Sequence, residues 1–159
     1  VILIGGGGPL SAEMQKQIEE EGLSGKVVLL GRLSDEDLAD HYGACDLFCL
    51  SSIWKTEAFG MVQIEAMSCG KPVVATKIPG SGVAWVNKHG YSGLNVPPED
   101  SAAIAEAIRC ILADEQTYQT FSVNAKARYE EHFTMPLFLE RCGEIYERVL
   151  NGTAADYGL

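Results

Sequence analysis

Two glutamates, Glu57 and Glu65, stand with seven residues between them around a predicted helix start near Gly60. The backbone N–H groups of Phe59, Gly60 and Met61 open this helix, where the first N–H groups lack intrahelical partners and the helix dipole favours an anion. Glu65 follows Gly60 by five residues, or about 7–8 Å along the helix axis. We therefore expect one elongated ligand, with phosphate at the helix start and vicinal hydroxyls on Glu65. Glu57 would face the other end of this ligand.

The helix that carries Glu65 is expected over Gly60–Ser68 and is almost entirely apolar. Its apolar side chains cover most of the circumference: Met61, Val62, Ile64, Ala66 and Met67. A helix of this kind is buried, and a buried carboxylate is costly unless it is paired or hydrogen-bonded. Two interpretations follow for Glu65: a ligand satisfies it, or a salt bridge does so in a purely structural helix.

Short apolar runs alternate with helical patterns along most of the chain. Strands are predicted at Val1–Ile4, Val27–Leu30, Leu47–Leu50, Pro72–Ala75 and Gly93–Val96. Helices are predicted at Ser11–Glu21, Asp35–Tyr42, Gly60–Ser68, Ser101–Ala113, Glu115–Glu131 and Pro136–Leu150. Continuously apolar strands are typical of a parallel sheet buried on both faces. The alternation predicts an α/β fold, a doubly wound, Rossmann-like sheet with helices on both faces. We expect one domain over residues 1–150 and a fraying tail over residues 151–159.

Ligands of such sheets bind at the carboxyl ends of the strands. The corresponding loops are Gly5–Leu10, Gly31–Ser34, Ser51–Phe59 and Thr76–Val83. In the first loop, Gly8 belongs either to a turn near a phosphate or to a tight strand-to-helix connection. A dinucleotide site is not expected there, because Ser11 stands where the last glycine of the GxGxxG pattern would fall.

The second predicted helix has signals at both of its ends. Ser34 and Asp37 form an acidic variant of the capping box. Gly43 is placed to adopt a left-handed conformation after a helix that ends at Tyr42. Asp35 fits either the first turn of any helix, where acidic residues are favoured, or a role in binding a guanine base.

Composition excludes several functions. A formal net charge of −10 argues against nucleic-acid binding, which needs clustered Lys and Arg. No apolar run approaches the length of a membrane span, and the opening residues lack the features of a signal peptide. The three histidines have no metal-ligand spacing, and the five cysteines form no CxxC pair. Reduced thiols and a cytoplasmic location are expected.

Four further side chains have expected surroundings. Lys55 and Lys71 are expected to be solvated. Trp54 and Trp85 are expected to pack in the core or between domains, with sugar stacking as the alternative.

The spacing of Glu57 and Glu65, with Phe59-Gly60 between them and Gly70-Lys-Pro-Val after them, resembles the E-x7-E segment of family 4 glycosyltransferases, retaining enzymes of the GT-B fold. The resemblance extends over about Val1 to Leu150. It also includes the segments Gly6-Gly-Gly-Pro-Leu10, Val27–Gly31, Ala44-Cys-Asp46 and Gly90-Tyr-Ser-Gly-Leu-Asn-Val-Pro97. The departures are small, such as Ala58 where glycine is frequent.

The resemblance implies roles for the site residues. Glu57 would contact hydroxyls of the donor sugar as the catalytic-site carboxylate, and Glu65 would contact the ribose hydroxyls. The loop at Ala58 and the backbone of Phe59, Gly60 and Met61 would hold the sugar and the diphosphate. Arg32 and Leu33 would lie against the base mainly through their main chain, with Gly8 and Asp35 as further donor-site residues. The family needs no metal or other cofactor.

The resemblance also implies that part of the enzyme lies outside this chain. The first βα unit of the domain, with the Arg and Lys that neutralise the diphosphate, and the acceptor-binding N-terminal domain are both expected upstream of Val1. The isolated chain should therefore bind donor weakly and be inactive. The full-length protein would transfer a sugar from a GDP-mannose-type or UDP-sugar donor to a saccharide or lipid-linked acceptor, with retention of configuration. The segments Thr56-Glu-Ala-Phe-Gly60 and Gly80 to Gly90 look similar to those of bacterial mannosyl- or rhamnosyltransferases of surface polysaccharide pathways. Peripheral association with the inner face of the membrane could come through the missing domain.

Two other functions stay open from the sequence. One is a non-catalytic relative that binds a nucleotide sugar or a partner protein. The other is a GT-B enzyme of another class, a phosphorylase or an epimerase. Donor hydrolysis by the full-length protein would distinguish a transferase from a non-catalytic relative. Product analysis with nucleotide sugars against inorganic phosphate would distinguish it from a phosphorylase or an epimerase.

Overall fold

The computed structural model describes residues 1–151, so the expected tail lies outside the described residues except for Asn151. The chain divides into two compact units, Val1–Ala44 and Cys45–Leu159. Each unit contains its own parallel sheet. The expected single domain over residues 1–150 stays a prediction.

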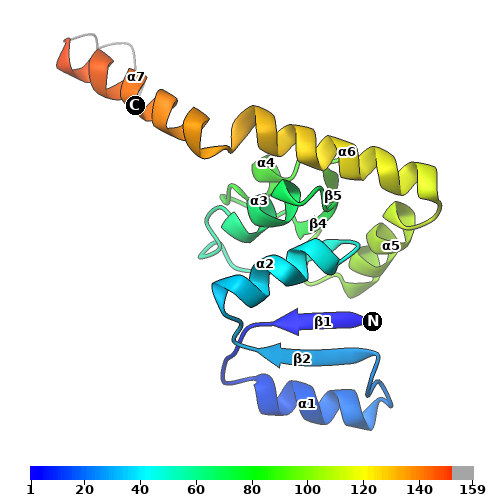
Figure 1. The fold of residues 1–159 in the computed structure, drawn as a ribbon. Helices are drawn as coiled ribbons and strands as arrows, with labels where there is room; N and C mark the ends of the chain where they lie inside the picture. Colours follow the sequence, from blue (N-terminus) through cyan, green and yellow to red (C-terminus); the bar gives the residue numbers. More distant parts are fainter. Residues whose placement is uncertain (152–159) are drawn as a thin grey trace. The chain divides into compact units, whose positions relative to one another are not determined.

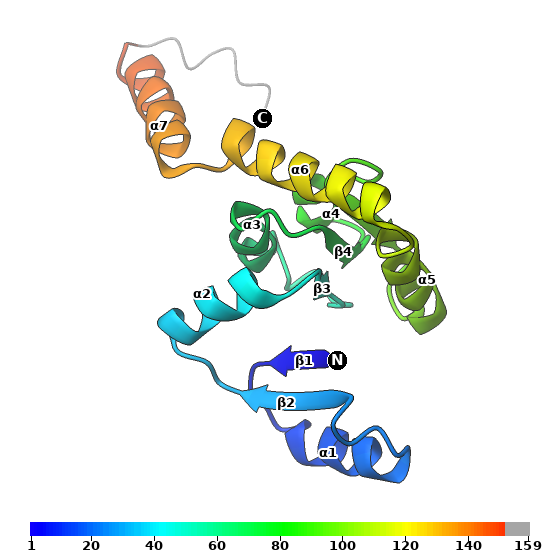
Figure 2. The same ribbon diagram turned by 45° about the vertical axis from the view of Figure 1, so that its right-hand side comes forward.

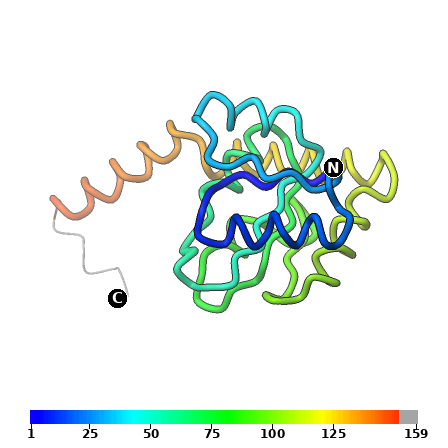
Figure 3. Tube along the Cα trace, turned by 90° about the horizontal axis from the view of Figure 1, so that it is seen from below, coloured from blue at the N-terminus to red at the C-terminus, as the bar shows by residue number. Residues whose placement is uncertain are grey.

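In the first unit, β1 (Ile2–Gly5) pairs in parallel with β2 (Val27–Gly31). The connecting helix α1 (Ser11–Glu20) runs alongside the two strands, as Figure 3 shows. The expectation that strands are buried on both faces is wrong for β1, where Ile2 is 59% exposed and Leu3 is 50% exposed. The physical reason is that this sheet has two strands among the described residues, so β1 has a neighbouring strand along one edge.

Helix α2 (Asp35–Ala44) begins as predicted but ends later. The Ser34 hydroxyl donates to Asp37 Oδ2 at 2.6 Å and accepts from the Asp37 backbone N–H at 3.1 Å. These hydrogen bonds lower the pKa of Asp37. The predicted end at Tyr42 is wrong, because the helix continues to Ala44 and Gly43 does not have a positive φ. One glycine costs a helix only about 1 kcal/mol, which does not suffice to end it.

In the second unit, three parallel strands lie in the order β3 (Phe48–Leu50), β4 (Val73–Thr76) and β5 (Gly93–Val96). Figures 1 and 2 show these strands with their helices. The helices are α3 (Met61–Ser68), α4 (Val83–Val86), α5 (Ser101–Ile111), α6 (Glu115–His132) and α7 (Met135–Leu150). The sequence did not predict α4, whose single turn is too short to show a helical period.

The central strand β4 is buried along its whole length and joins two hydrophobic cores. Val73 and Ala75 pack in a core with residues of α3, α4 and α6. Val74 points to the opposite face, as alternation along a strand requires, and packs with residues of α5. Helices therefore cover both faces of this sheet, and the predicted α/β arrangement is confirmed. Gly93 allows β5 to approach β4, because a Cβ at this position would lie 1.8 Å from Val73 O.

The three C-terminal helices have clear start signals. Asp100 caps α5 by accepting from the Ala103 N–H at 2.8 Å, and Asp114 caps α6 by accepting from the Thr117 N–H at 2.9 Å. Pro136 lies in the first turn of α7, where its missing N–H has no cost. Helix α7 leads away from the sheet of its unit (Figures 1 and 2), and none of its residues is buried.

Candidate functional site

Glu57 lies in the loop between β3 and α3, and its side chain is half-buried. The Ser52 hydroxyl donates to Glu57 Oε2 at 3.4 Å. Ser52 is itself held by β4, because the Thr76 hydroxyl donates to the Ser52 carbonyl. The end of β4 thus supports the residue that orients Glu57.

Gly60 is the N-cap of α3, which begins at Met61, one residue later than predicted. Its backbone is left-handed, with φ 76° and ψ 59°, a conformation that glycine adopts far more readily than other residues. A Cβ at Gly60 would lie 2.6 Å from Gln63 Nε2 and 2.9 Å from Leu50 Cδ2. Backbone conformation and packing therefore both require glycine at the start of this helix.

The loop before α3 is bonded to the turn before α4. The Ser81 hydroxyl donates to the Glu57 carbonyl at 2.5 Å, and the Gly82 N–H donates to the Ala58 carbonyl at 2.7 Å. A Cβ at Gly82 would lie 3.1 Å from the same Ala58 carbonyl. The close approach of the two segments thus depends on a small residue at position 82.

Gln63 binds the next two carbonyls of the loop. Its Nε2 donates to the Phe59 carbonyl at 3.3 Å, and its backbone N–H donates to the Gly60 carbonyl at 2.9 Å. In the part of the chain that the structure describes, the backbone N–H groups of residues 58–61 donate to no acceptor. They include the groups that the sequence predicts as anion ligands, and the described part of the protein uses none of them as a donor.

Glu65 is half-buried, so the prediction of a buried carboxylate is wrong. Met61, one helical turn earlier on the same face of α3, is 59% exposed. The opposite side of the helix, with Gln63, Ile64 and Met67, is buried. The prediction failed because apolar composition does not reveal how far each face of a helix is exposed. The face that carries Met61 and Glu65 runs from the start of α3 to Glu65.

The remaining predicted site residues lie in the first unit. Gly8 is held in a turn, where its carbonyl accepts from the Ser11 hydroxyl at 2.9 Å. Arg32 and Asp35 are exposed, and Leu33 is half-buried, with its Cδ1 atom 3.4 Å from the position of a Cβ on Gly5. The loops after β1 and β2 are joined by a 2.7 Å hydrogen bond from the Gly6 N–H to the Gly31 carbonyl. The structure thus brings Gly8 and Leu33 to the same end of this two-stranded sheet.

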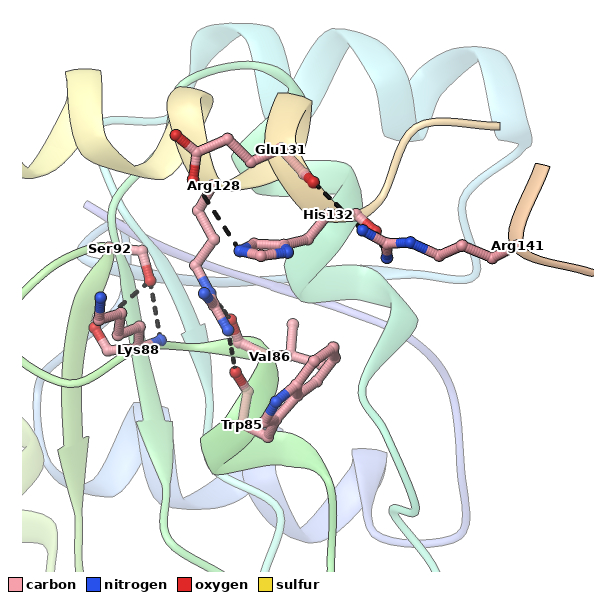
Figure 4. Close-up of polar contacts among 8 residues, drawn as sticks. All are labelled: Trp85, Val86, Lys88, Ser92, Arg128, Glu131, His132 and Arg141. Atoms are coloured by element: carbon pink, nitrogen blue, oxygen red, sulfur yellow. Dashed lines mark hydrogen bonds and ion pairs between the residues drawn. The ribbon is translucent and has the colours of Figure 1, made fainter. Parts of the chain in front are cut away.

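Aromatic rings pack around Phe59, the last residue of the loop before Gly60. Phe59 lies 5.9 Å from Trp85 and 6.4 Å from Phe133, measured between ring centroids. Trp85 is in turn fixed by Arg128, whose side chain reaches from α6 to the carbonyls of Trp85 and Val86 (Figure 4). Arg128 is buried, and this burial lowers the pKa of its guanidinium. Trp85 has these contacts but is 57% exposed, and Trp54 is 71% exposed, so the expectation that they pack in the core is wrong for both. Packing between domains stays a prediction.

Three residues of this arrangement were missed by sequence reasoning: Gln63, Ser81 and Gly82. Only the Thr76–Val83 loop as a whole was expected at the ligand-binding edge of the sheet. The glycines that flank Ser81 were a usable signal for close backbone approach. Gln63 was detectable as the one uncharged polar residue in the apolar run from Met61 to Ile64.

Other titratable groups have structural surroundings. His89 Nδ1 accepts from the Asn95 N–H at 2.9 Å. All five cysteines are free thiols, and burial raises the pKa of Cys45 and Cys49. Within residues 1–151, no group of three or more His, Cys, Asp or Glu residues is placed to hold a metal ion. No helix of this part of the chain has both the length and the apolar character to cross a bilayer.

Comparison with known proteins identifies the family of the chain. Residues 1–128 match the family described as Glycosyl transferases group 1. O-antigen chain mannosyltransferase C from Escherichia coli is 33% identical over 149 residues, which cover 94% of this chain and 40% of that protein. D-rhamnosyltransferase WbpZ from Pseudomonas aeruginosa is 37% identical over 133 residues, which cover 84% of this chain and 34% of that protein. The structure of Anabaena HepE with UDP has a TM-score of 0.81 at 31% identity, and the match covers 91% of this chain and 40% of that one.

These comparisons also bear on the extent of the chain and on its fold. The chain spans between 34% and 40% of the length of these three relatives. The structural likeness confirms the predicted GT-B type of fold. Since the family match runs over residues 1–128 of 159, the chain belongs to the glycosyl transferases group 1 family.

Proposed function

We propose that this chain is the donor-binding half of a retaining, family 4 glycosyltransferase, and that a nucleotide-diphosphate sugar lies along the start of α3. The available N–H groups of residues 58–61 carry the proposal, because backbone donors at a helix start bind phosphate. From there the ribose hydroxyls reach Glu65, on the same face of α3 as the exposed Met61. Glu57, before the helix, binds hydroxyls of the transferred sugar.

The chemistry needs little from the side chains of this half. The bond between the anomeric carbon and the diphosphate oxygen breaks, and the acceptor oxygen forms a bond to the same carbon. In a front-face reaction the proton of the acceptor hydroxyl goes to the departing phosphate oxygen. Negative charge grows on that oxygen in the transition state, and fixed N–H groups stabilise it there without reorganisation. We propose that no metal takes part.

The donor that we propose is a GDP-mannose-type or UDP-sugar. HepE was solved with UDP and with UDP-glucose, and two relatives are named a mannosyltransferase and a rhamnosyltransferase. The resemblance supports the remaining roles that we propose: the main chain of Arg32 and Leu33 on the base, Asp35 on a guanine, and Gly8 near the phosphates. The acceptor is a saccharide or a lipid-linked saccharide of cell-surface polysaccharide synthesis.

We further propose that the rest of the full-length protein completes the active site. A helix dipole supplies about half a unit charge, which does not balance a diphosphate. Basic residues outside this chain must supply the remainder, and an N-terminal domain must bind the acceptor. The complete enzyme would work in the cytoplasm, at the inner face of the membrane where that domain associates with it.

The test uses the full-length protein with GDP-mannose and UDP-glucose, alone and with a saccharide acceptor. Glu65→Ala should raise the donor KM or abolish turnover, whereas Glu106→Ala, at an exposed surface ion pair, should change neither. NMR of the product should show the anomeric configuration of the donor. Unchanged kinetics of Glu65→Ala would contradict the role of Glu65. Turnover that needs inorganic phosphate would indicate a phosphorylase instead.

A further inference from the structure

The carbonyl groups of the loop before α3 accept hydrogen bonds from the rest of the unit. This fixes the direction of the N–H groups of the same peptides. In a trans peptide the C=O and the following N–H point in opposite directions. The carbonyls of residues 57–60 all accept hydrogen bonds from inside the unit, which directs the N–H groups of residues 58–61 to the other side. Successive unbonded N–H groups next to a left-handed residue such as Gly60 are the elements of an anion-binding nest.

Resting on the proposed donor site, we propose that Ser81 and Gln63 are positioning residues of the transferase, which aim the N–H groups of residues 58–61 at the donor diphosphate without touching it. Ser81 holds the first part of the loop and Gln63 holds the second. Neither needs to contact the ligand, because each acts through the peptide whose carbonyl it binds.

Ser81 forms hydrogen bonds both to the loop before α3 and to the turn before α4. Its hydroxyl donates to the Glu57 carbonyl at 2.5 Å and lies 3.4 Å from the Ala58 carbonyl. The same oxygen accepts from the Val83 N–H at 3.2 Å, which fixes the serine rotamer. One hydroxyl therefore sets the orientation of the first peptide of the nest and links it to the start of α4.

Gln63 is a poor choice for packing alone. Its side chain is fully buried, and its Oε1 atom has no hydrogen-bond partner among the described residues. A buried unpaired acceptor is destabilising. Its Nε2 instead lies between two acceptors, the carbonyls of Phe59 and Val83, at 3.3 and 3.4 Å. Rotating the amide by half a turn would place oxygen against both carbonyls. The residue is thus suited to its position by its donor and not by its bulk.

The experiment measures the binding of GDP, UDP and the corresponding monophosphates to the full-length protein and its variants by titration calorimetry. Ser81→Ala removes the hydroxyl, and Ser81→Thr restores it. Ser122→Ala is the matched control, because the Ser122 hydroxyl also donates to a carbonyl, that of Gly70, at 2.7 Å and is also half-buried, but it lies outside the loop. Gln63→Met tests the second half of the loop independently with a side chain of similar size.

Ser81→Ala and Gln63→Met should each weaken binding of the preferred diphosphate by about tenfold, the effect of losing one good hydrogen bond to a charged group. Monophosphate binding should weaken less, and Ser81→Thr should recover most of the affinity. Ser122→Ala should bind like the wild type. In turnover assays with GDP-mannose or UDP-glucose, Ser81→Ala should raise the donor KM more than it lowers kcat.

Three results would overturn the inference, and they can be told apart. If the wild type binds a diphosphate but Ser81→Ala weakens it no more than Ser122→Ala, the positioning role is wrong and the proposed donor site survives. If the wild type binds neither GDP nor UDP, the donor site and the positioning role both fail. Should Ser81→Ala not fold, Gln63→Met decides, because equal loss of mono- and diphosphate binding would indicate a purely structural role.

Discussion

Gly60 is the residue at which the loop turns into α3, and its φ of 76° and its contacts with Gln63 and Leu50 are separate constraints. Gly60→Ala should therefore destabilise the chain by about 2–5 kcal/mol, the sum of left-handed strain and overpacking. Urea unfolding followed by circular dichroism measures this loss. It should also reduce donor affinity in the full-length protein, because the N–H groups of the loop would move.

Gly43 provides the contrasting glycine. It is exposed, lies inside α2 and has nothing within 4 Å of the position of a Cβ. Gly43→Ala should stabilise the chain by about 0.5–1 kcal/mol through helix propensity. If both alanine variants lost stability equally, the contrast in backbone conformation between the two glycines would be wrong.

At this scale the sequence was informative about residues close in the chain. The Glu57–Glu65 spacing and the phosphate-binding helix start could be predicted, because a helix has a fixed rise and a known polarity. The roles of Ser81 and Gln63 could not, because the hydrogen bonds of their side chains to Glu57 and Val83 join residues 24 and 20 positions apart. The exposure of Met61 was also unpredictable, since it depends on which neighbours reach that face.

Helix α6 holds α4 in place through one buried cation. Arg128 Nε donates to the Val86 carbonyl at 2.6 Å, and Nη2 donates to the Trp85 carbonyl. Lysine keeps the charge but cannot reproduce this fork, so Arg128→Lys should cost about 2–3 kcal/mol of unfolding free energy. Arg109→Lys, at an exposed ion pair with Glu106, should change it by less than about 0.5 kcal/mol. Denaturant unfolding of both variants checks the difference.

Helix α6 also has a pH-dependent start. Hydrogen bonds from the Thr117 backbone and hydroxyl lower the pKa of Asp114, the N-cap residue. A lowered folded-state pKa means that the cap stabilises above the unfolded pKa of about 3.9, and that this contribution is lost as pH falls through the folded pKa. Asp114→Ala should therefore lower Tm at neutral pH, and the difference from wild type should shrink in acid.

Thermal unfolding between about pH 7 and about pH 2.5 measures this change. Asp114→Asn is the control, because asparagine caps a helix without titrating in this range. A Tm difference between wild type and Asp114→Ala that stays constant down to the lowest pH would contradict the assignment.

The helices and strands themselves were largely predictable, since apolar runs and caps are local signals. Strands β2, β4 and β5 and helices α1, α5 and α6 lie within a residue or two of their predicted ranges. Helix α4 was not predicted, because its four residues are too few to show a helical period. The end of α2 was placed too early because glycine was taken as a stop signal, although its helical backbone conformation is tolerated.

On the scale of the molecule, this chain should not bind donor well without the rest of the protein. Its formal net charge of −10 opposes an anionic ligand, and the N–H groups of residues 58–61 supply dipoles but no full positive charge. Calorimetry should give affinities for GDP and UDP at least about tenfold weaker for the isolated chain than for the full-length protein. Low-micromolar binding to the isolated chain would contradict this expectation.

Helix α7 should be dispensable for the folding of its unit, because none of its residues is buried. A chain that ends at Thr134 should unfold within about 2 °C of the longer chain, since little enthalpy is lost. Differential scanning calorimetry measures this, and a clearly lower Tm would mean that α7 contributes to the core. The helix exposes a row of apolar side chains at helical spacing: Met135, Phe138, Leu139, Ile145, Tyr146, Val149 and Leu150.

That row has a practical consequence for anyone handling the protein as a fragment. Exposed apolar side chains favour aggregation as the protein concentration rises. Turbidity of the longer chain would therefore report on α7 and carry no information about nucleotide recognition. A chain that ends at Thr134 would separate aggregation from nucleotide binding. It would keep Ser81 and Gln63 and would stay suitable for spectroscopy at high concentration.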